Sequence, residues 1–128
     1  MTIRSAKQMV SEASAAVETL PAAVAVTLAN DPGVTFVDVR DQGEREKAGT
    51  IEGAVHAPRP FLEFLADPTS ERHLPALGGD KRLVLFCASG GRSALAAKTL
   101  KDMGFSRVAH LAGGLPAWIA AGGPVTRA

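Results

Sequence analysis

Residues 83–100 read LVLF-CASGG-RSALAAKTL, and this stretch decides the fold. Its first four residues are wholly apolar, which is typical of a central strand buried on both faces of a parallel sheet. A loop of small residues follows, and then a helical pattern runs from about residue 92 to 103 and closes at Gly104. A strand, a tight loop and a helix in this order form the repeating unit of an α/β fold.

The rest of the chain alternates between the same two patterns on both sides of this unit. Gly and Pro separate the periodic runs, and no linker or internal repeat divides the chain. The sequence therefore predicts an α/β fold, in which a mainly parallel central sheet is flanked by helices. The predicted strands are 34–39, 54–57, 83–86 and 108–111, and the predicted helices are 6–18, 21–29, 41–48, 60–67, 92–103 and 115–121.

The length of the chain bounds the number of domains. Its 128 residues, 46% of them hydrophobic, are enough for one domain with a real core. Within that single domain we expect an N-terminal helical segment, residues 1–30, to pack on an α/β domain of residues 31–128.

Composition argues against several classes of partner. Fourteen Lys and Arg residues against thirteen Asp and Glu leave a formal net charge of +1 without a basic cluster, so we expect no nucleic-acid partner. The apolar segment 20–29 is shorter than the roughly 20 residues that a membrane-spanning helix needs, so no membrane span is expected. The single cysteine has no partner for an internal disulfide, which indicates a reduced, cytoplasmic setting.

That cysteine, Cys87, closes the apolar strand at the end where ligands bind in parallel sheets. The small residues after it let the loop curl and turn backbone N–H groups inward, and the start of the next helix adds free N–H donors and a partial positive charge. Arg92 adds a full positive charge. These features lower the pKa of a thiol and form a cradle for an anion. Most lone cysteines are small buried hydrophobes, but this setting favours a reactive thiolate.

Four segments of the chain, in this order, resemble the rhodanese family. The loop CASGGRS at 87–93, with Cys87 and Arg92 at the two ends of six residues, resembles the family's active-site loop. The other three are VDVR at 37–40, GTIEGA at 49–54, and LAGG at 111–114 with Trp118 behind it. The chain departs from the family pattern at Thr50, where the family often has His, and by a one-residue difference in length between residues 44 and 49.

The resemblance implies a sulfurtransferase of the thiosulfate:cyanide type. Cys87 would accept a sulfane sulfur from thiosulfate or a similar small anionic donor, become a persulfide, and pass the sulfur to cyanide or a thiol. Arg92 would share the catalysis by holding the donor. The expected substrate-binding residues are Ala88, Ser89, Gly90, Gly91 and Ser93, with Arg59 either joining them or simply solvated. No metal or organic cofactor is needed.

Two other functions stay open. In the first, Cys87 still becomes a persulfide, but the domain is a carrier or interaction module whose sulfur donor or acceptor is a protein. In the second, the chain is a cysteine-based phosphatase or arsenate reductase. The phosphatase signature places five residues between Cys and Arg, whereas four intervene here, and the smaller cradle favours sulfur over phosphate.

Several polar residues near the expected site are assigned to structure. Asp38 and Arg40 are expected to form a buried or half-buried ion pair. His56 and His110 are expected to be hydrogen-bonded structural residues at strand ends. Gly113-Gly114 is expected to permit a tight turn and a close approach of the backbone.

Overall fold

The helices and strands follow the predicted alternation along the chain. The computed structural model describes residues 2–128. Its helices are α1 (Ala6–Ala16), α2 (Ala22–Val26), α3 (Gln42–Ala48), α4 (Leu62–Ala66), α5 (Gly91–Met103) and α6 (Gly114–Ala120), with 3₁₀ turns at Arg59–Phe61 and Pro75–Leu77. Its strands are β1 (Glu18–Leu20), β2 (Val34–Asp38), β3 (Thr50–Ile51), β4 (Val55–His56), β5 (Arg82–Phe86), β6 (Val108–Leu111) and β7 (Val125–Thr126).

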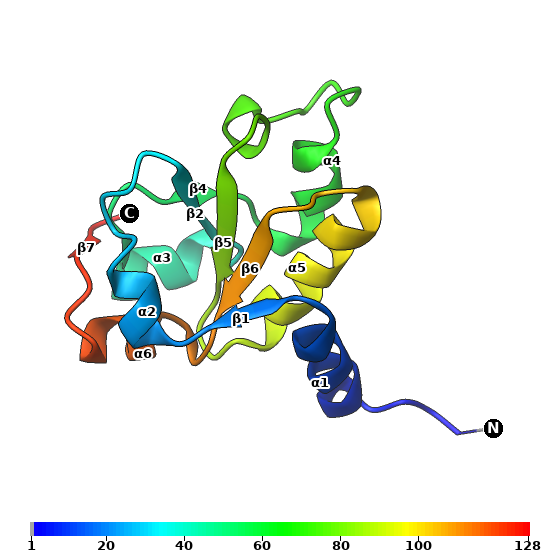
Figure 1. The fold of residues 1–128 in the computed structure, drawn as a ribbon, viewed down its shortest axis with the longest axis horizontal. Coiled ribbons are helices and arrows are strands. Elements are labelled where there is room, and N and C mark those ends of the chain that lie inside the picture. The colour runs from blue at the N-terminus through cyan, green and yellow to red at the C-terminus, as the bar shows by residue number, and fades with distance from the viewer. Residues whose placement is uncertain (1) are drawn as a thin grey trace.

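Five of the strands form one parallel sheet in the order β1-β6-β5-β2-β4. The most apolar strand, β5, lies at its centre between β6 and β2 (Figure 1). The strands β3 and β7 pair antiparallel in a separate ribbon. The predicted α/β fold with a mainly parallel sheet is therefore confirmed, and all carboxyl ends of the central strands meet at one edge.

Helices cover both faces of the central sheet. Helices α1, α4 and α5 lie on one side, and α2 and α6 lie on the other (Figure 1). Along β5 the side chains alternate, so that Leu83 and Leu85 join the core on the first side, while Val84 and Phe86 join the core on the second side, beside Trp118. Each such fully buried side chain stabilises the fold by about 1.5–3 kcal/mol, which explains why the strand is apolar throughout.

The N-terminal segment differs from the prediction. Residues 18–20 form strand β1, which pairs in parallel with β6, and they do not end the first helix. Helix α1 stops at Ala16, and the next residue, Val17, is extended. The β-branched side chains of Val17 and Thr19 favour this extended backbone over a helix. Residues 1–30 thus supply a strand as well as helices, and the division at residue 30 stays a prediction.

Other differences concern short elements. Helix α2 ends at Val26, three residues before the predicted end, and turns follow it. The strands β3 and β7 were not predicted, because two-residue strands leave no periodic pattern. The longest helix of the described residues, α5, has 13 residues, and between residues 2 and 128 no helix combines the length and apolarity needed to cross a membrane.

Candidate active site

Cys87 lies just past the carboxyl end of β5, in the loop that leads into α5. Its side chain is fully buried. The loop turns at Gly90, which caps α5 with a left-handed backbone (φ 105°) that a residue with a Cβ adopts only under strain. This glycine lets the loop bring the first turn of α5 against the sulfur.

The sulfur of Cys87 is surrounded by hydrogen-bond donors. The backbone N–H groups of Gly90 and Ser93 donate to Sγ at 3.1 and 3.4 Å, and the Ser93 hydroxyl oxygen lies 3.5 Å away. Burial raises the pKa of Cys87, but hydrogen bonds from Ser93, Ser89 and Gly90 outweigh it, so the pKa falls below the ordinary value of 9.0. The predicted cradle is thus formed in part by three residues of the loop and helix, and it favours the thiolate.

Arg92, predicted to hold an anionic donor, is bound by a carboxylate of its own chain. Its Nη1 and Nη2 donate to Oε1 and Oε2 of Glu44 at 2.6 and 2.8 Å. Hydrogen bonds from Arg92 lower the pKa of Glu44 to about 2, so the pair is fully charged at neutral pH. Both side chains are partly exposed, at 43% and 30%, which places the pair at the rim of the site.

Sequence reasoning missed Glu44 because 48 residues separate it from Arg92. One local signal was available. The Asp41 side chain accepts the N–H of Glu44 at 2.8 Å and the Glu44 carboxylate reaches back to the N–H of Asp41, which is a capping box. The spacing of Asp41 and Glu44 fixes the start of α3, and α3 in turn presents Glu44 to the loop.

Ser93 and His110 extend the hydrogen bonds away from the sulfur. The Ser93 Oγ is buried, donates to the carbonyl of Gly90 at 3.2 Å, and lies 3.2 Å from Nδ1 of His110. His110 is 3% exposed, and burial lowers its pKa, so the ring is neutral near pH 7. Its Nε2 lies 3.1 Å from Oγ1 of Thr19 and 3.4 Å from Oγ of Ser14. His110 is hydrogen-bonded, as expected, and one of its partners belongs to the active-site loop.

Asp38 and Arg40 form the buried ion pair that the sequence predicted. Nε and Nη2 of Arg40 donate to the two carboxylate oxygens of Asp38 at 3.0 and 2.9 Å, and the Thr50 hydroxyl donates to the same carboxylate at 2.8 Å. Thr50 therefore binds the pair from the position where the family often has His. Arg40 also donates to the carbonyl of Gly49 at 2.6 Å, which ties the end of α3 to the end of β2.

The segment after β6 holds the loop from the other side. The N–H of Leu115 donates to the carbonyl of Cys87 at 2.9 Å. A Cβ placed on Gly114 would lie 2.5 Å from that carbonyl oxygen and 2.6 Å from the carbonyl of Ala88. The close backbone approach predicted for Gly113-Gly114 is therefore real, and it rests on Gly114.

Comparison with known protein families adds a decisive observation to this geometry. A model of the rhodanese-like domain matches residues 21–121. The chain belongs to the rhodanese-like family. The resemblance drawn from the four sequence segments is confirmed, and the matched region includes Cys87, Arg92 and Glu44.

Three rhodanese-like or related proteins bear on function. One is a structure from Rhodopseudomonas palustris, described as a protein of unknown function and a possible tyrosine phosphatase. It is 46% identical to this chain and superimposes with a TM-score of 0.92, and the superposition covers 98% of each chain. The polysulfide-sulfur transferase homodimer of Wolinella succinogenes is 33% identical with a TM-score of 0.74, over 94% of this chain and 85% of that one. YrkF of Bacillus subtilis, a proposed sulfur carrier protein, is 34% identical over 89 residues, which are 70% of this chain and 43% of that protein.

The sulfur transferase and the sulfur carrier support a sulfur-transfer role for the rhodanese-like chain, whereas the description of the Rhodopseudomonas palustris structure names a possible phosphatase. The chain spans less than half the length of the curated relatives that it matches. The roles of the individual site residues stay predictions.

Two clefts flank the rhodanese-like loop. The first, of about 430 Å³, contains both Arg59 and Arg92, so the structure brings these two predicted residues to one cleft. Arg59 is bound there by Glu63 at 2.9 Å and by Thr99 at 3.2 Å. The second cleft, of about 250 Å³, is mostly apolar and lies beside Ala88, with Leu115, Pro116 and Ile119 in its wall.

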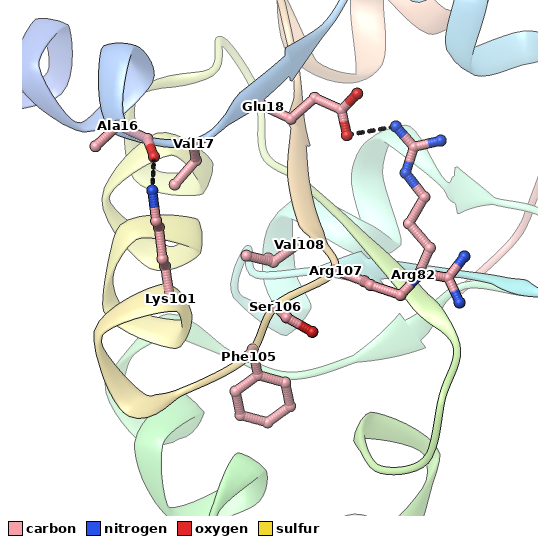
Figure 2. Close-up of a pocket in the computed structure, with 9 residues that line it drawn as sticks. All are labelled: Ala16, Val17, Glu18, Arg82, Lys101, Phe105, Ser106, Arg107 and Val108. Atoms are coloured by element: carbon pink, nitrogen blue, oxygen red, sulfur yellow. Dashed lines mark hydrogen bonds and ion pairs between the residues drawn. The ribbon is translucent and has the colours of Figure 1, made fainter.

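A third cleft, of about 500 Å³, lies away from the chemistry. Figure 2 shows its lining, in which Arg82 binds Glu18 across the cleft and Lys101 binds the carbonyl of Ala16. Residues at the amino ends of β1, β5 and β6 border it, whereas Cys87 follows the carboxyl end of β5. Its basic groups are largely satisfied by neighbours within the chain, and we assign it no part in the reaction.

Proposed function

We propose that this protein transfers sulfane sulfur through a persulfide on Cys87. The observation that carries the proposal is the buried sulfur with N–H donors from Gly90 and Ser93 directed at it, which favours a thiolate. In the first half-reaction the thiolate attacks the outer sulfur of thiosulfate, the S–S bond of the donor breaks, and sulfite leaves with the electron pair. In the second, cyanide or a thiolate attacks the outer sulfur of the persulfide and regenerates the Cys87 thiolate.

The same donors serve both half-reactions. The N–H groups that stabilise the thiolate also stabilise the negative charge on a bound persulfide, so little rearrangement is needed between the two states. Reaction through a covalent enzyme intermediate predicts ping-pong kinetics. Arg92 would attract the anionic donor at the rim, in competition with Glu44.

The full burial of Cys87 bears on the identity of the substrates. A narrow group, such as a small anion or the end of a thiol side chain, is needed to reach the sulfur. This requirement is compatible with thiosulfate and cyanide, and with a cysteine of a partner protein acting as sulfur donor or acceptor. The second candidate function is therefore a persulfide carrier for a protein partner, which the similarity to the proposed sulfur carrier YrkF favours.

The test is the intact mass of the purified protein before and after thiosulfate, with Cys87→Ser alongside. The chain has one cysteine, so a gain of one sulfur atom on the wild type, absent from Cys87→Ser and reversed by cyanide, assigns the persulfide to Cys87. A gain that forms slowly from thiosulfate but rapidly from a persulfidated protein donor would favour the carrier. Hydrolysis of an aryl phosphate with no gain of sulfur would overturn the proposal in favour of a phosphatase.

A further inference from the structure

A buried row of polar side chains leads from the sulfur to the N-terminal segment of the chain. It runs from Cys87 through Ser93 and His110 to Thr19. The first three side chains are at most 3% exposed. Burying a histidine costs free energy unless both ring nitrogens find partners, and here both do. The reaction described so far gives His110 no part.

The hydrogen-bond geometry gives this row a direction. The Thr19 hydroxyl donates its proton to the carbonyl of Ser14 at 3.1 Å, so Oγ1 of Thr19 is left to accept from Nε2 of His110. A neutral imidazole with its proton on Nε2 has an acceptor at Nδ1, which faces the Ser93 hydroxyl at 3.2 Å. The Ser93 hydroxyl has a single proton, and for the transfer this proton turns to Nδ1 from the carbonyl of Gly90, which lies equally near at 3.2 Å. The Ser93 oxygen can then accept from the Cys87 S–H at 3.5 Å. Each donor points away from the sulfur.

Resting on the proposed function, in which Cys87 reacts as a thiolate, we propose that His110 is a positioning residue that takes up, through the Ser93 hydroxyl, the proton that the Cys87 thiol releases. The S–H bond breaks as a new O–H bond forms on Ser93, and the original O–H bond of Ser93 breaks as an N–H bond forms at Nδ1 of His110. Thiol and imidazole become thiolate and imidazolium without a change in net charge.

The exchange keeps every hydrogen bond in the row. After it, the Ser93 hydroxyl donates to the thiolate and accepts from Nδ1 of His110, so each contact is retained with its direction reversed. The Ser93 hydroxyl is a donor to the sulfur in this state and an acceptor from it in the thiol state. The geometry therefore accommodates both protonation states of Cys87 when the Ser93 hydroxyl proton rotates away from the carbonyl of Gly90, with the side-chain heavy atoms in place.

Within residues 2–128, the side chains that hydrogen-bond His110 are all uncharged hydroxyls. Lys7 of α1 is exposed, and the other charged groups on the elements packed around His110 bind elsewhere: Glu12 with Arg4, Glu18 with Arg82, Arg92 with Glu44, Lys98 with Asp102, and Lys101 with the carbonyl of Ala16. Burial is the one cause of the lowered pKa of His110. The ring is therefore neutral at rest, with a lone pair on Nδ1. It takes up a proton when Cys87, which is separated from it by two hydrogen bonds, becomes a thiolate.

The outer end of the row lies outside the region that the family model matches. Ser14 lies in α1 and Thr19 lies in β1, whereas the family model matches the chain only from residue 21 onward. In the proposed relay, the N-terminal segment supplies the acceptor, Oγ1 of Thr19, that holds the resting proton on Nε2 of His110 and leaves Nδ1 facing the loop.

The first test measures the rate of Cys87 alkylation by iodoacetamide against pH in the wild type and in His110→Asn. Asparagine retains a polar partner for Ser93 but cannot take up a proton. We expect the inflection of the rate to move up by about one pH unit, so that alkylation near neutral pH slows about tenfold. The matched control is His73→Asn, because His73 binds the carbonyl of Leu65 far along the chain from the loop. Profiles of His110→Asn and wild type that coincide would overturn the proposal.

A purely structural role for His110 is separated by adding Ser93→Ala. Since the proton passes through Ser93, His110→Asn should add no further shift in the Ser93→Ala background. An equal shift in both backgrounds would mean that His110 acts on the sulfur by another route, and the relay would be wrong.

The second test needs no variant of His110 and so does not depend on that variant folding. Nitrogen NMR of the wild-type protein should show both ring nitrogens of His110 protonated while Cys87 is a free thiolate, and Nδ1 unprotonated after Cys87 is alkylated. An unchanged ring would overturn the relay. Neither test uses a sulfur donor, so a protein that passes both yet gains no sulfur from any donor would refute the proposed function and leave the relay standing.

Discussion

Arg92 is the side chain proposed to meet an incoming anion at the rim, and its guanidinium is already bound by a carboxylate. Glu44 occupies both Nη atoms, so an anionic donor that binds Arg92 must displace or lie beside a carboxylate. Like charges repel, and the carboxylate therefore weakens donor binding even as it holds Arg92 in place. If thiosulfate is the donor, as proposed, we expect the charge of this pair to govern how strongly the site attracts it.

Glu44→Gln should improve the use of an anionic donor. The change removes the competing negative charge and leaves a side chain of the same size. Because partly exposed ion pairs are worth about 0.2–1 kcal/mol, we expect the KM for thiosulfate to fall by about 1.4- to fivefold, with kcat little changed. Steady-state kinetics with thiosulfate and cyanide measure this.

The controls for that prediction lie on both sides of the pair. Arg92→Ala should raise the KM for thiosulfate, and Glu12→Gln, on the exposed surface of α1, should leave it unchanged. Because the pKa of Glu44 is lowered from 4.5 to about 2, the pair contributes stability above pH 4.5 and loses it as the pH falls toward 2. An unchanged KM in Glu44→Gln would mean that the donor does not pass this pair.

At the scale of elements, the loop is held by the segments that surround it. Helix α3 presents Glu44 to Arg92, the start of α6 hydrogen-bonds the carbonyl of Cys87, and β6 places His110 against Ser93. The hydrogen bonds within the loop run to the sulfur and from the Ser93 hydroxyl to the carbonyl of Gly90, and these elements add hydrogen bonds from outside it. Its shape therefore depends on how closely these elements approach, and the closest approach is at Gly114.

Gly114→Ala should distort the loop. The added Cβ would meet backbone atoms of Cys87 and Ala88 at 2.5–2.6 Å, and φ at this position is +67°. Left-handed strain alone costs about 1–3 kcal/mol, and the overlap adds to it. We expect a lower unfolding temperature and slower persulfide formation, measured by thermal denaturation and by mass.

Gly53→Ala separates the two causes. Gly53 has a similar positive φ of 80°, but nothing lies within 4 Å of the added Cβ. This variant should lose stability from strain alone and form the persulfide at the wild-type rate. Equal losses of stability and rate in the two variants would show that the approach of Gly114 to the loop has no special effect.

At the scale of the whole molecule, what could be predicted from the sequence was local. The apolar run before Cys87, the glycines after it and the cap of α5 are neighbours in the chain, so their pattern shows the strand, loop and helix directly. Glu44 lies 48 residues from Arg92 in sequence, and His110 lies 17 residues from Ser93. A local sequence pattern cannot indicate pairs so far apart. Strand β1 was not predicted, because three residues are too few to show the alternation of apolar and polar side chains that is typical of a strand. The helical pattern just before it also extended the predicted helix over its first residue.

Strand β1 is also the part of the fold whose loss should be felt across the molecule. It covers the edge of β6, with Leu20 opposite Leu111, and Leu20 is 5% exposed. A variant that begins at residue 21 would lose this pairing, the packing of α1 on α5, and the burial of Leu20, whose side chain alone is worth about 1.5–3 kcal/mol. For a domain of this size we expect the unfolding temperature to fall by about 10 °C.

The exposed edge of β6 should have a second consequence. Unpaired backbone groups on an edge strand recruit other chains, so the variant that begins at residue 21 should associate at concentrations where the full chain does not. Light scattering measures this alongside thermal denaturation. The matched control begins at Ser5, the residue that caps α1, and should behave as the full chain. If the shorter variant melted with the full chain and stayed dispersed, the three-residue pairing of β1 would be no more than a surface contact, and the sheet would be complete from residue 21 onward.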